Sequence, residues 1–230
     1  MGSVARSNLI PQVPSRRRLG VLMLDTRFPR PPGDVGHPAS WRMPVEYFTV
    51  RGASPQRVVR EHELALLQPF VAAALGLVER GACAITTSCG FLVQFQAALQ
   101  AALPVPVWTS SLLLLPTLQR PGVITVDAAA LGATHLTAAG APADTPVEGL
   151  QPGCHLQRTL LQDLPTLDPA AAEADVVAAA QRLLRRQPAI TSLVFECTNM
   201  PPYADAVQRA TGLPVHHLMT LVHDRFAALP

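Results

Sequence analysis

Two segments of the sequence, one in each half of the chain, share a pattern of an apolar run, a cysteine and the start of a helix. Residues 190–195 form a short apolar, β-branched run of the kind that makes a buried strand. Cys197 follows this run, and Asn199 with two prolines behind it is typical of a helix N-terminus. Residues 82–92 repeat the pattern around Cys89. Ligands of open α/β sheets bind where strands end and helices begin, so the repeat predicts two similar halves that share one site.

The position of these two cysteines favours chemical activity. A helix N-terminus carries partial positive charge and free N–H groups, and both stabilise a thiolate relative to a thiol. One such cysteine is more often an inert buried side chain, but two in matching positions favour a shared role. Cys83, in the middle of a strand, and Cys154, in the expected crossover between the halves, are interpreted as structural.

The composition excludes several classes of protein. The sequence contains no lysine, which excludes a pyridoxal phosphate enzyme and a phosphate-binding loop of the GxxxxGK[ST] type, because both need one. The formal net charge is +2, and the basic residues 16–18 are interpreted as a solvated flank, so no nucleic-acid partner is expected. No apolar run is long enough for a membrane span, and the first residues do not resemble a secretory signal. We therefore expect a cytoplasmic protein with free thiols.

The order of apolar runs and helical patterns predicts an α/β fold. Strands are expected at residues 19–24, 45–50, 105–109, 122–126 and 147–150, besides those that lead to the two cysteines. Helices are expected at residues 54–80, 90–103, 112–118, 170–186, 201–211 and 219–229. This alternation indicates mostly parallel sheets flanked by helices. The predicted organisation is a flexible tail (1–17), an N-terminal half to which the C-terminal helix returns (18–127), and a C-terminal half (128–230).

A Pro-rich loop follows the first strand. Residues 27–44 form a loop of the length that often makes a lid or a binding wall. An arginine in it, such as Arg27 or Arg30, can hold a substrate carboxylate or can simply be solvated. The sequence leaves both roles open.

A metal site is not expected. His216 and His217 are adjacent, so on a strand they point to opposite faces, and the sequence has no HExxH or CxxC spacing. Glu196 is expected to point away from Cys197 by strand alternation. We therefore expect Glu196 to serve in capping or in an ion pair rather than as a base.

The motifs TTSCGF at residues 86–91 and ECTNMPP at residues 196–202, with a first strand that ends at Asp25, resemble the aspartate/glutamate racemase superfamily. Its members include cofactor-independent amino-acid racemases, hydantoin racemases, maleate isomerases and arylmalonate decarboxylases. The resemblance covers residues 19–229. It implies two pseudo-symmetric, Rossmann-like halves, each a mostly parallel sheet flanked by helices, with the active site in the cleft between them.

The resemblance also implies roles for individual residues. In racemases of the superfamily, a cysteine from each half flanks the stereocentre of the substrate, and Cys89 and Cys197 match these catalytic positions. The implied substrate-binding residues lie at the same strand ends: Asp25, Ser88, Gly90, Phe91, Thr198 and Asn199. After the first cysteine, Gly-Phe replaces the usual Asn-Thr, and Asn199 replaces a histidine that often occurs at the second site. These departures disfavour glutamate and aspartate as substrates.

Together these observations predict an isomerase, a cofactor-independent racemase or epimerase that acts on a small carboxylate or related carbon acid. A thiol–thiolate pair can supply the base on one face of the carbon and the acid on the other. Two alternatives stay open: a cis–trans isomerase or decarboxylase of the same fold with Cys197 as nucleophile or proton donor, and a non-catalytic small-molecule binding protein. The expected partner is a small molecule, with no cofactor, metal, nucleic acid or membrane, and a homodimer is an open possibility.

Overall fold

Two parallel sheets of four strands form the framework of the molecule. The computed structural model describes residues 17–229, so nearly all of the predicted tail, together with residue 230, lies outside the described residues. The first sheet has the order β2-β1-β3-β4, with β1 Arg18–Leu24, β2 Val45–Val50, β3 Ala82–Thr87 and β4 Val107–Trp108. The second has the order β6-β5-β7-β8, with β5 Pro121–Thr125, β6 Val147–Gly149, β7 Ser192–Phe195 and β8 Val215–His216. The two orders are equivalent, and the predicted α/β fold of two similar halves is confirmed.

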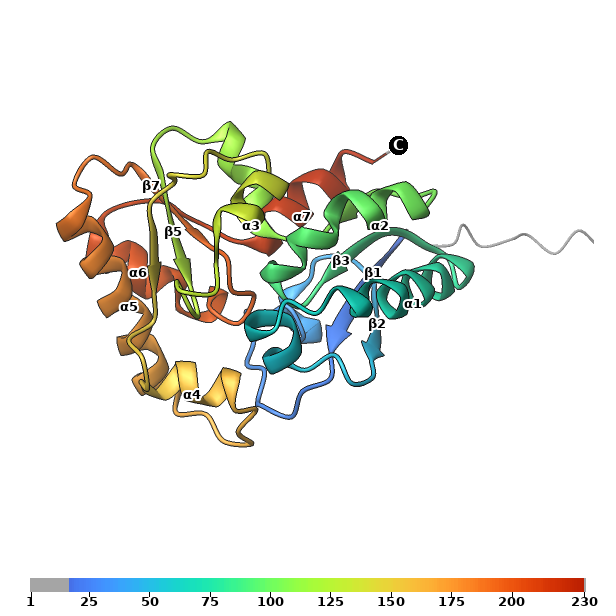
Figure 1. The fold of residues 1–230 in the computed structure, drawn as a ribbon, viewed down its shortest axis with the longest axis horizontal. Helices are drawn as coiled ribbons and strands as arrows, with labels where there is room; N and C mark the ends of the chain where they lie inside the picture. Colours follow the sequence, from blue (N-terminus) through green and yellow to red (C-terminus); the bar gives the residue numbers. More distant parts are fainter. Residues whose placement is uncertain (1–16, 230) are drawn as a thin grey trace, which may run out of the picture.

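Helices cover the sheets of both halves (Figure 1). They are α1 Leu67–Glu79, α2 Gln96–Ala102, α3 Ala133–Ala138, α4 His155–Leu161, α5 Pro169–Arg186, α6 Ala204–Thr211 and α7 Leu218–Ala227. The cap predicted for α5 is confirmed, because the Asp168 carboxylate accepts hydrogen bonds from the N–H groups of Ala170 and Ala171 at 2.9 and 3.2 Å. Both central strands of each sheet are therefore buried between helices, as their apolar sequences require.

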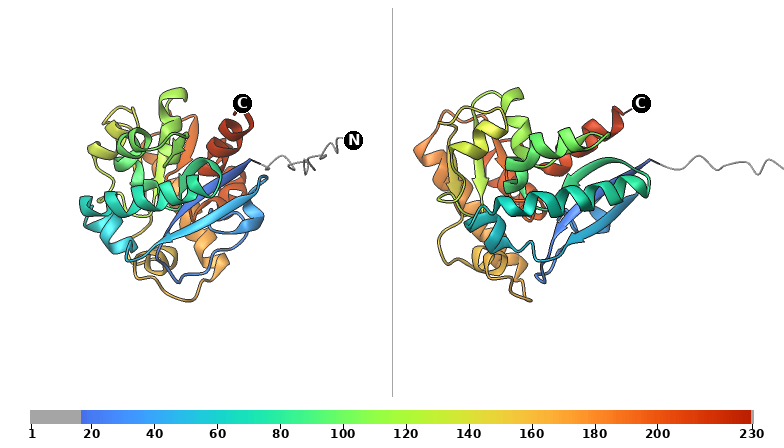
Figure 2. Two further views of the ribbon diagram at one scale, coloured as in Figure 1. Left: turned by 90° about the vertical axis from the view of Figure 1, so that its right-hand side faces the viewer. Right: turned by 45° about the vertical axis from the view of Figure 1, so that its right-hand side comes forward.

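The last helix, α7, packs on the first sheet although it follows the strands of the second. Leu218, Leu221 and Val222 of α7 share one buried cluster with Leu19 and Val21 of β1. Both views in Figure 2 show this C-terminal helix beside the strands of the first half. The boundary of the halves at residues 127 and 128 stays a prediction.

The helix predicted at residues 54–80 is wrong in its first half. A π-helical turn covers Gln56–Arg60, a 3-10 turn covers Leu64–Leu66, and regular helix begins only with α1. Between the turns His62 adopts a left-handed conformation with φ 48°, which ends any helix there. The Arg57 guanidinium holds the bend by binding the Glu63 carboxylate through two contacts of 2.5 and 2.7 Å.

Two further segments differ from the sequence prediction. Residues 112–118 lie largely in a 3-10 helix, Ser111–Thr117, which contains Pro116 and so cannot continue as a regular α-helix. The crossover between the halves contains two short helices, α3 and α4, that were not predicted. Each is too short for a clear helical period in the sequence.

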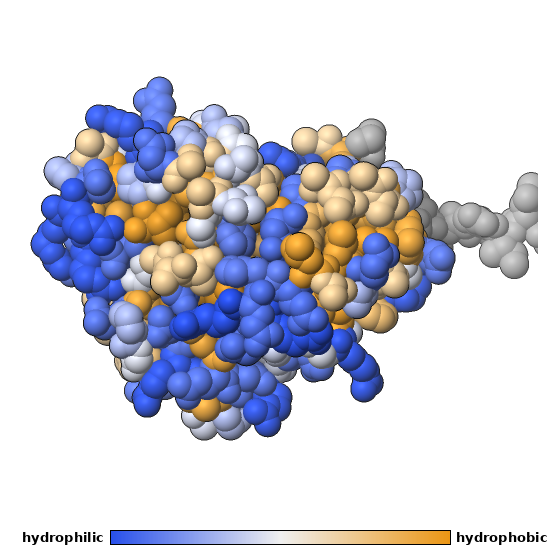
Figure 3. Space-filling model, viewed as in Figure 1, coloured by the Kyte–Doolittle hydropathy of each residue, from blue (hydrophilic) through white to orange (hydrophobic). Residues whose placement is uncertain are grey.

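The face shown in Figure 3 carries a group of hydrophobic residues over the region of α1 and α2, and a mixture of polar and hydrophobic residues over the other half. The exposed large apolar side chains of the described chain include Leu75 in α1, at 39% exposure. The homodimer stays a prediction. Across residues 17–229, no helix combines the length and the apolar character needed to cross a membrane.

Candidate active site

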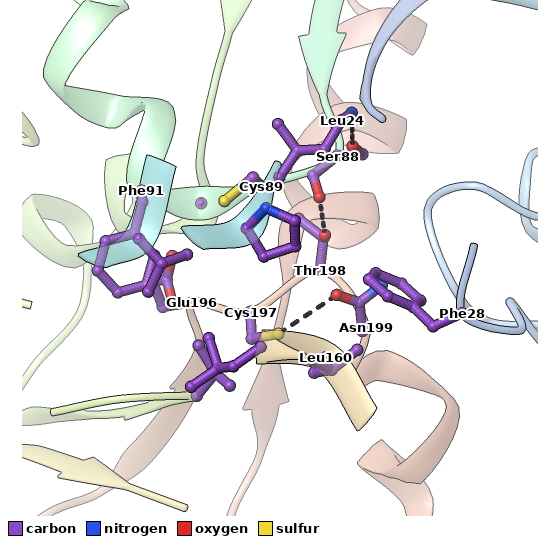
Figure 4. Close-up of a pocket in the computed structure, with 15 residues that line it drawn as sticks. Leu24, Phe28, Ser88, Cys89, Phe91, Leu160, Glu196, Cys197, Thr198 and Asn199 are labelled. Atoms are coloured by element: carbon purple, nitrogen blue, oxygen red, sulfur yellow. Dashed lines mark hydrogen bonds between the residues drawn. The ribbon is translucent and has the colours of Figure 1, made fainter. Parts of the chain in front are cut away.

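A small cavity lies where strands of both sheets end. It encloses about 370 Å³ of space between side chains, its open mouth included. The segments after β3 and β7 supply Cys89 and Cys197, and Leu24 at the end of β1 and Val126 after β5 complete this wall. The predicted cysteines therefore come to one cavity from the two halves of the chain (Figure 4).

Hydrogen bonds join the two cysteine-bearing segments. The Thr198 hydroxyl donates to the carbonyl oxygen of Ser88 at 2.6 Å, across the boundary between the sheets. The Ser88 hydroxyl oxygen accepts from the Leu24 N–H at 2.9 Å, which fixes it to the end of β1 (Figure 4). Because Ser88 and Thr198 are both buried, these bonds set the position of each cysteine relative to the other.

Both cysteines are almost completely buried, at 9% exposure for Cys89 and 6% for Cys197. Burial, and next the charge of Glu196, raise the pKa of each thiol well above its ordinary range. The predicted activation by helix N-termini is therefore outweighed in the free protein. The N–H groups of Phe91 and Leu92 counteract the rise in the pKa of Cys89. The Asn199 N–H acts in the same way on Cys197, whose thiol donates a hydrogen bond to Asn199 Oδ1 at 3.6 Å. Two N–H groups thus act on Cys89 and one on Cys197, so Cys89 is the better placed of the two to ionise.

Glu196 lines the same cavity, and its Oε1 lies against Gly90, the residue after Cys89. Its direction away from Cys197 stays a prediction. Strand β7 ends at Phe195, so strand alternation no longer governs the direction of the next side chain. The carboxyl group is fully buried and forms no ion pair with any residue in the described range 17–229; it accepts one hydrogen bond, from the Thr125 hydroxyl at 2.7 Å. Burial raises the pKa of Glu196 to about 8. Its role is therefore neither a cap nor an ion pair.

The Pro-rich loop forms one wall of the cavity through Phe28 and binds the second cysteine segment. The buried Asp34 carboxylate accepts a hydrogen bond from the Asn199 amide at 2.6 Å and pairs with Arg30 at 2.9 Å. Asn199 is therefore not the helix cap that the sequence suggested, because Met200 takes that position. The Arg30 guanidinium also lies over the Phe28 ring, 4.6 Å from its centroid, so Arg30 is already engaged in holding the loop.

Some predicted residues lie elsewhere. Asp25 is exposed, and its carboxylate accepts a hydrogen bond from the Gly52 N–H at 2.9 Å, so the structure gives it no contact with the cavity. His217 caps α7 by accepting from the Thr220 N–H at 3.4 Å. Cys83 and Cys154 are partly buried outside the cavity lining. Within residues 17–229, no cluster of His, Cys, Asp and Glu side chains is arranged to hold a metal ion.

Other predicted residues and several unpredicted ones line the cavity. Gly90 and Phe91 line it beside Cys89, as Thr198 and Asn199 do beside Cys197. The sequence analysis missed Leu160 and Leu161, which reach the cavity from the unpredicted helix α4. No signal in a seven-residue helix would have identified them as lining residues.

Replacing Thr198 by valine is expected to lower the free energy of unfolding by about 2 kcal/mol, because the buried Ser88 carbonyl loses its partner. Thermal unfolding measures the change, with Thr145→Val as the matched control. The Thr145 hydroxyl donates to the Pro142 carbonyl at 2.7 Å, but in an exposed turn where water can replace it. Equal losses of unfolding free energy in the two variants would show that the hydrogen bond between the halves stabilises the protein no more than one in an exposed turn.

Several solved structures share this fold. Unliganded arylmalonate decarboxylase matches 92% of this chain and 92% of its own, with a TM-score of 0.60 and 17% identity. Allantoin racemase from Pseudomonas fluorescens matches 91% and 89%, with a TM-score of 0.58 and 16% identity. A putative Asp/Glu racemase from Yersinia pestis matches 92% and 98%, with a TM-score of 0.58 and 11% identity. The resemblance to the aspartate/glutamate racemase superfamily is thus confirmed at the level of fold.

Similarity in sequence points to a narrower group of enzymes. No protein-family model matches the chain. Dimethylsulfoniopropionate lyase from Durusdinium sp. clade D is 32% identical over 212 residues, which cover 86% of this chain and 70% of that protein. Dimethylsulfoniopropionate lyase 3 from Emiliania huxleyi is 32% identical over 233 residues, and the match spans 92% of this chain but 59% of that relative's length. The chain therefore belongs to the family of the dimethylsulfoniopropionate lyases, built on the fold of the aspartate/glutamate racemase superfamily.

Proposed function

We propose that the protein is a lyase that releases dimethyl sulfide from dimethylsulfoniopropionate or a closely related sulfonium carboxylate. The observation that carries the proposal is the pair of buried thiols, Cys89 and Cys197, on one cavity of a chain from this family. The proposed activity agrees with the expected enzyme, but it belongs to the lyase class rather than to the isomerase class that was predicted from the resemblance.

The reaction is an elimination that needs one base. The Cys89 thiolate removes a proton from carbon 2, next to the carboxylate, and the electron pair of that C–H bond forms the new carbon–carbon double bond. The bond between carbon 3 and sulfur breaks, and its electron pair leaves with the sulfur as neutral dimethyl sulfide. Acrylate is the second product. Because the leaving group is neutral, no acid is needed to protonate it.

The lining of the cavity suits a small sulfonium carboxylate. Phe28, Phe91 and Leu160 offer apolar surface to the two methyl groups, and aromatic rings attract cations. The positive sulfonium offsets the cost of a buried thiolate, which the free protein does not support. Ser88 and Cys197 also line the cavity, and a hydroxyl group and a thiol can both donate a hydrogen bond to the carboxylate.

A second candidate is a cofactor-independent racemase or epimerase. It is favoured by one specific observation, that the two thiols reach the cavity from different halves of the chain, as the inversion of a stereocentre requires. Inversion needs a base on one face and an acid on the other, whereas elimination needs a base alone.

Proton NMR in deuterated water distinguishes the two candidates. With dimethylsulfoniopropionate and no added metal or cofactor, we expect acrylate and dimethyl sulfide to appear in equal amounts. A panel of chiral carboxylic acids and hydantoins should show no exchange of the stereocentre proton. Exchange in that panel without any release of sulfide would favour the racemase and contradict the lyase.

A further inference from the structure

The buried carboxyl group of Glu196 lines the cavity that holds both thiols, and within residues 17–229 it has no ion pair of the kind that buried carboxylates normally have. Its Oε1 is within 2.4 Å of the position that a Cβ on Gly90 would occupy, next in the chain to Cys89. Its charge is the second cause, after burial, that raises the pKa of both Cys89 and Cys197. Buried carboxyl groups that lack a cation stay protonated at neutral pH because ionisation without a partner is costly.

The hydrogen bonds of Glu196 indicate where its proton resides. The Thr125 hydroxyl donates to Oε2, so Oε2 acts as the acceptor oxygen. Within residues 17–229, Oε1 is fully buried and has no hydrogen-bond partner. A protonated carboxyl group has one O–H donor, and at Oε1 this donor is free for a ligand in the cavity that Glu196 lines.

The titratable groups that face Glu196 are the two cysteines. Cys89 follows β3, Cys197 follows β7, and the neighbour at the end of β5 is Thr125, which does not titrate in this range. Besides Glu196, the charges that act on the two cysteines are Arg30, on Cys89, and Asp34, on Cys197, and these two residues pair with each other. No positive charge in the described chain is thus placed to hold Glu196 ionised.

We propose that Glu196 is a catalytic residue that works as a neutral carboxylic acid and donates a hydrogen bond from Oε1 to the substrate carboxylate. This inference rests on the proposed lyase function. Negative charge builds up on the carboxylate as the proton leaves carbon 2, and a donor placed in a dry cavity stabilises that charge. Glu196 itself gives up no proton: the proton taken by Cys89 balances the reaction and later leaves to water.

The ionisation of Glu196 then limits activity at high pH. Because burial raises its pKa to about 8, the donor is present below that pH and lost above it. The thiolate of Cys89 becomes more abundant as pH rises, but a negative Glu196 holds the thiol proton more tightly. The rate is therefore expected to climb with pH and to level off near pH 8.

The decisive experiment compares Glu196→Gln with Glu196→Met, and uses Glu79→Gln, at the exposed end of α1, as the matched control. Glutamine keeps a donor but cannot ionise, so this variant is expected to stay within about tenfold of the wild-type release of dimethyl sulfide, with a rate that continues to climb above pH 8. Methionine has no donor and is expected to lose about a hundredfold. A Glu196→Gln variant as inactive as Glu196→Met would overturn the inference, because the ionised carboxylate would then be the working form.

Two measurements made without substrate test the protonation of Glu196 independently of the proposed lyase function. Alkylation of Cys89 by iodoacetamide should level off near pH 8 in the wild type but not in Glu196→Gln. The folded pKa of Glu196 is raised, so the stability it contributes is complete below the ordinary value of 4.5 and is lost as pH rises from there to about 8. The unfolding temperature should show this loss in the wild type and not in Glu196→Gln.

If these differences appeared without any lyase activity, the proposed function would be wrong while the neutral state of Glu196 was confirmed. If they were missing, Glu196 would be ionised and the inference overturned.

Discussion

Replacing Cys89 by serine is expected to lower the rate of dimethyl sulfide release by roughly a thousandfold, the middle of the range for loss of a general base. A serine hydroxyl is a far weaker acid than a thiol, so no base remains near neutral pH. Cys197→Ser is expected to lose less, roughly tenfold, since the proposed role of Cys197 is to donate a hydrogen bond and a hydroxyl group can also donate. The asymmetry follows from the N–H groups of Phe91 and Leu92, which support a thiolate at Cys89.

Cys83→Ser is the matched control for these substitutions. Cys83 is partly buried in β3 and its thiol donates to the Arg18 carbonyl at 3.4 Å, away from the cavity. Its rate should equal that of the wild type, and all three variants should keep their unfolding temperature within a few degrees. Equal, near-complete losses in Cys89→Ser and Cys197→Ser would instead indicate a two-base inversion, and a larger loss in Cys197→Ser would make that residue the base.

Replacing Gly90 by alanine is expected to lower the free energy of unfolding by about 3 kcal/mol. The added Cβ would stand 2.2 Å from the backbone carbonyl oxygen of Glu196 and 2.4 Å from its Oε1, and a backbone atom cannot move aside as a flexible side chain can. For a chain of this size the unfolding temperature should fall by roughly 10 °C. Activity of the folded fraction should fall as well, because the shift separates the segments that carry the cysteines.

Gly132→Ala controls for the general effect of losing a glycine. A Cβ at Gly132 would meet no atom within 4 Å, and its backbone is extended, with φ −89°. That variant is expected to unfold within about 1 kcal/mol of the wild type. If Gly90→Ala were equally harmless, the close approach of the Cys89 and Glu196 segments would not exist in solution.

The strands and the two cysteines could be predicted from the sequence, because the signals for them are local. The apolar run of β7 and the polar residues that end it mark both the strand and its tip. The residues that surround the cysteines were harder to place, because distant contacts decide their positions. Asn199 reads as a helix cap, yet its amide binds Asp34, 165 positions away in the sequence. A partner so distant in the sequence cannot be predicted from the local sequence pattern.

The position of Glu196, a candidate catalytic residue, could not be predicted from the local sequence pattern either. Strand alternation predicted a direction away from Cys197 and a capping or ion-pairing role. Alternation holds only while the chain remains in a strand, however, and β7 ends one residue before Glu196, which lines the cavity. The bend between residues 60 and 67 was missed for a related reason, since the contact of Arg57 with Glu63 competes with helical hydrogen bonds. Tertiary contacts outweigh local propensity at both places.

The central claim is that Cys89 removes a proton from carbon 2 of a sulfonium carboxylate bound in the cavity. The most direct measurement is the single-turnover rate of dimethyl sulfide release from substrate deuterated at carbon 2, compared with substrate deuterated in the methyl groups. A single turnover excludes product release, so breaking the carbon–deuterium bond should slow the reaction several-fold, while deuterated methyl groups should leave it unchanged. Equal rates for the two substrates, accompanied by a covalent adduct on a cysteine, would contradict proton abstraction and indicate displacement of the sulfide by a nucleophilic thiolate.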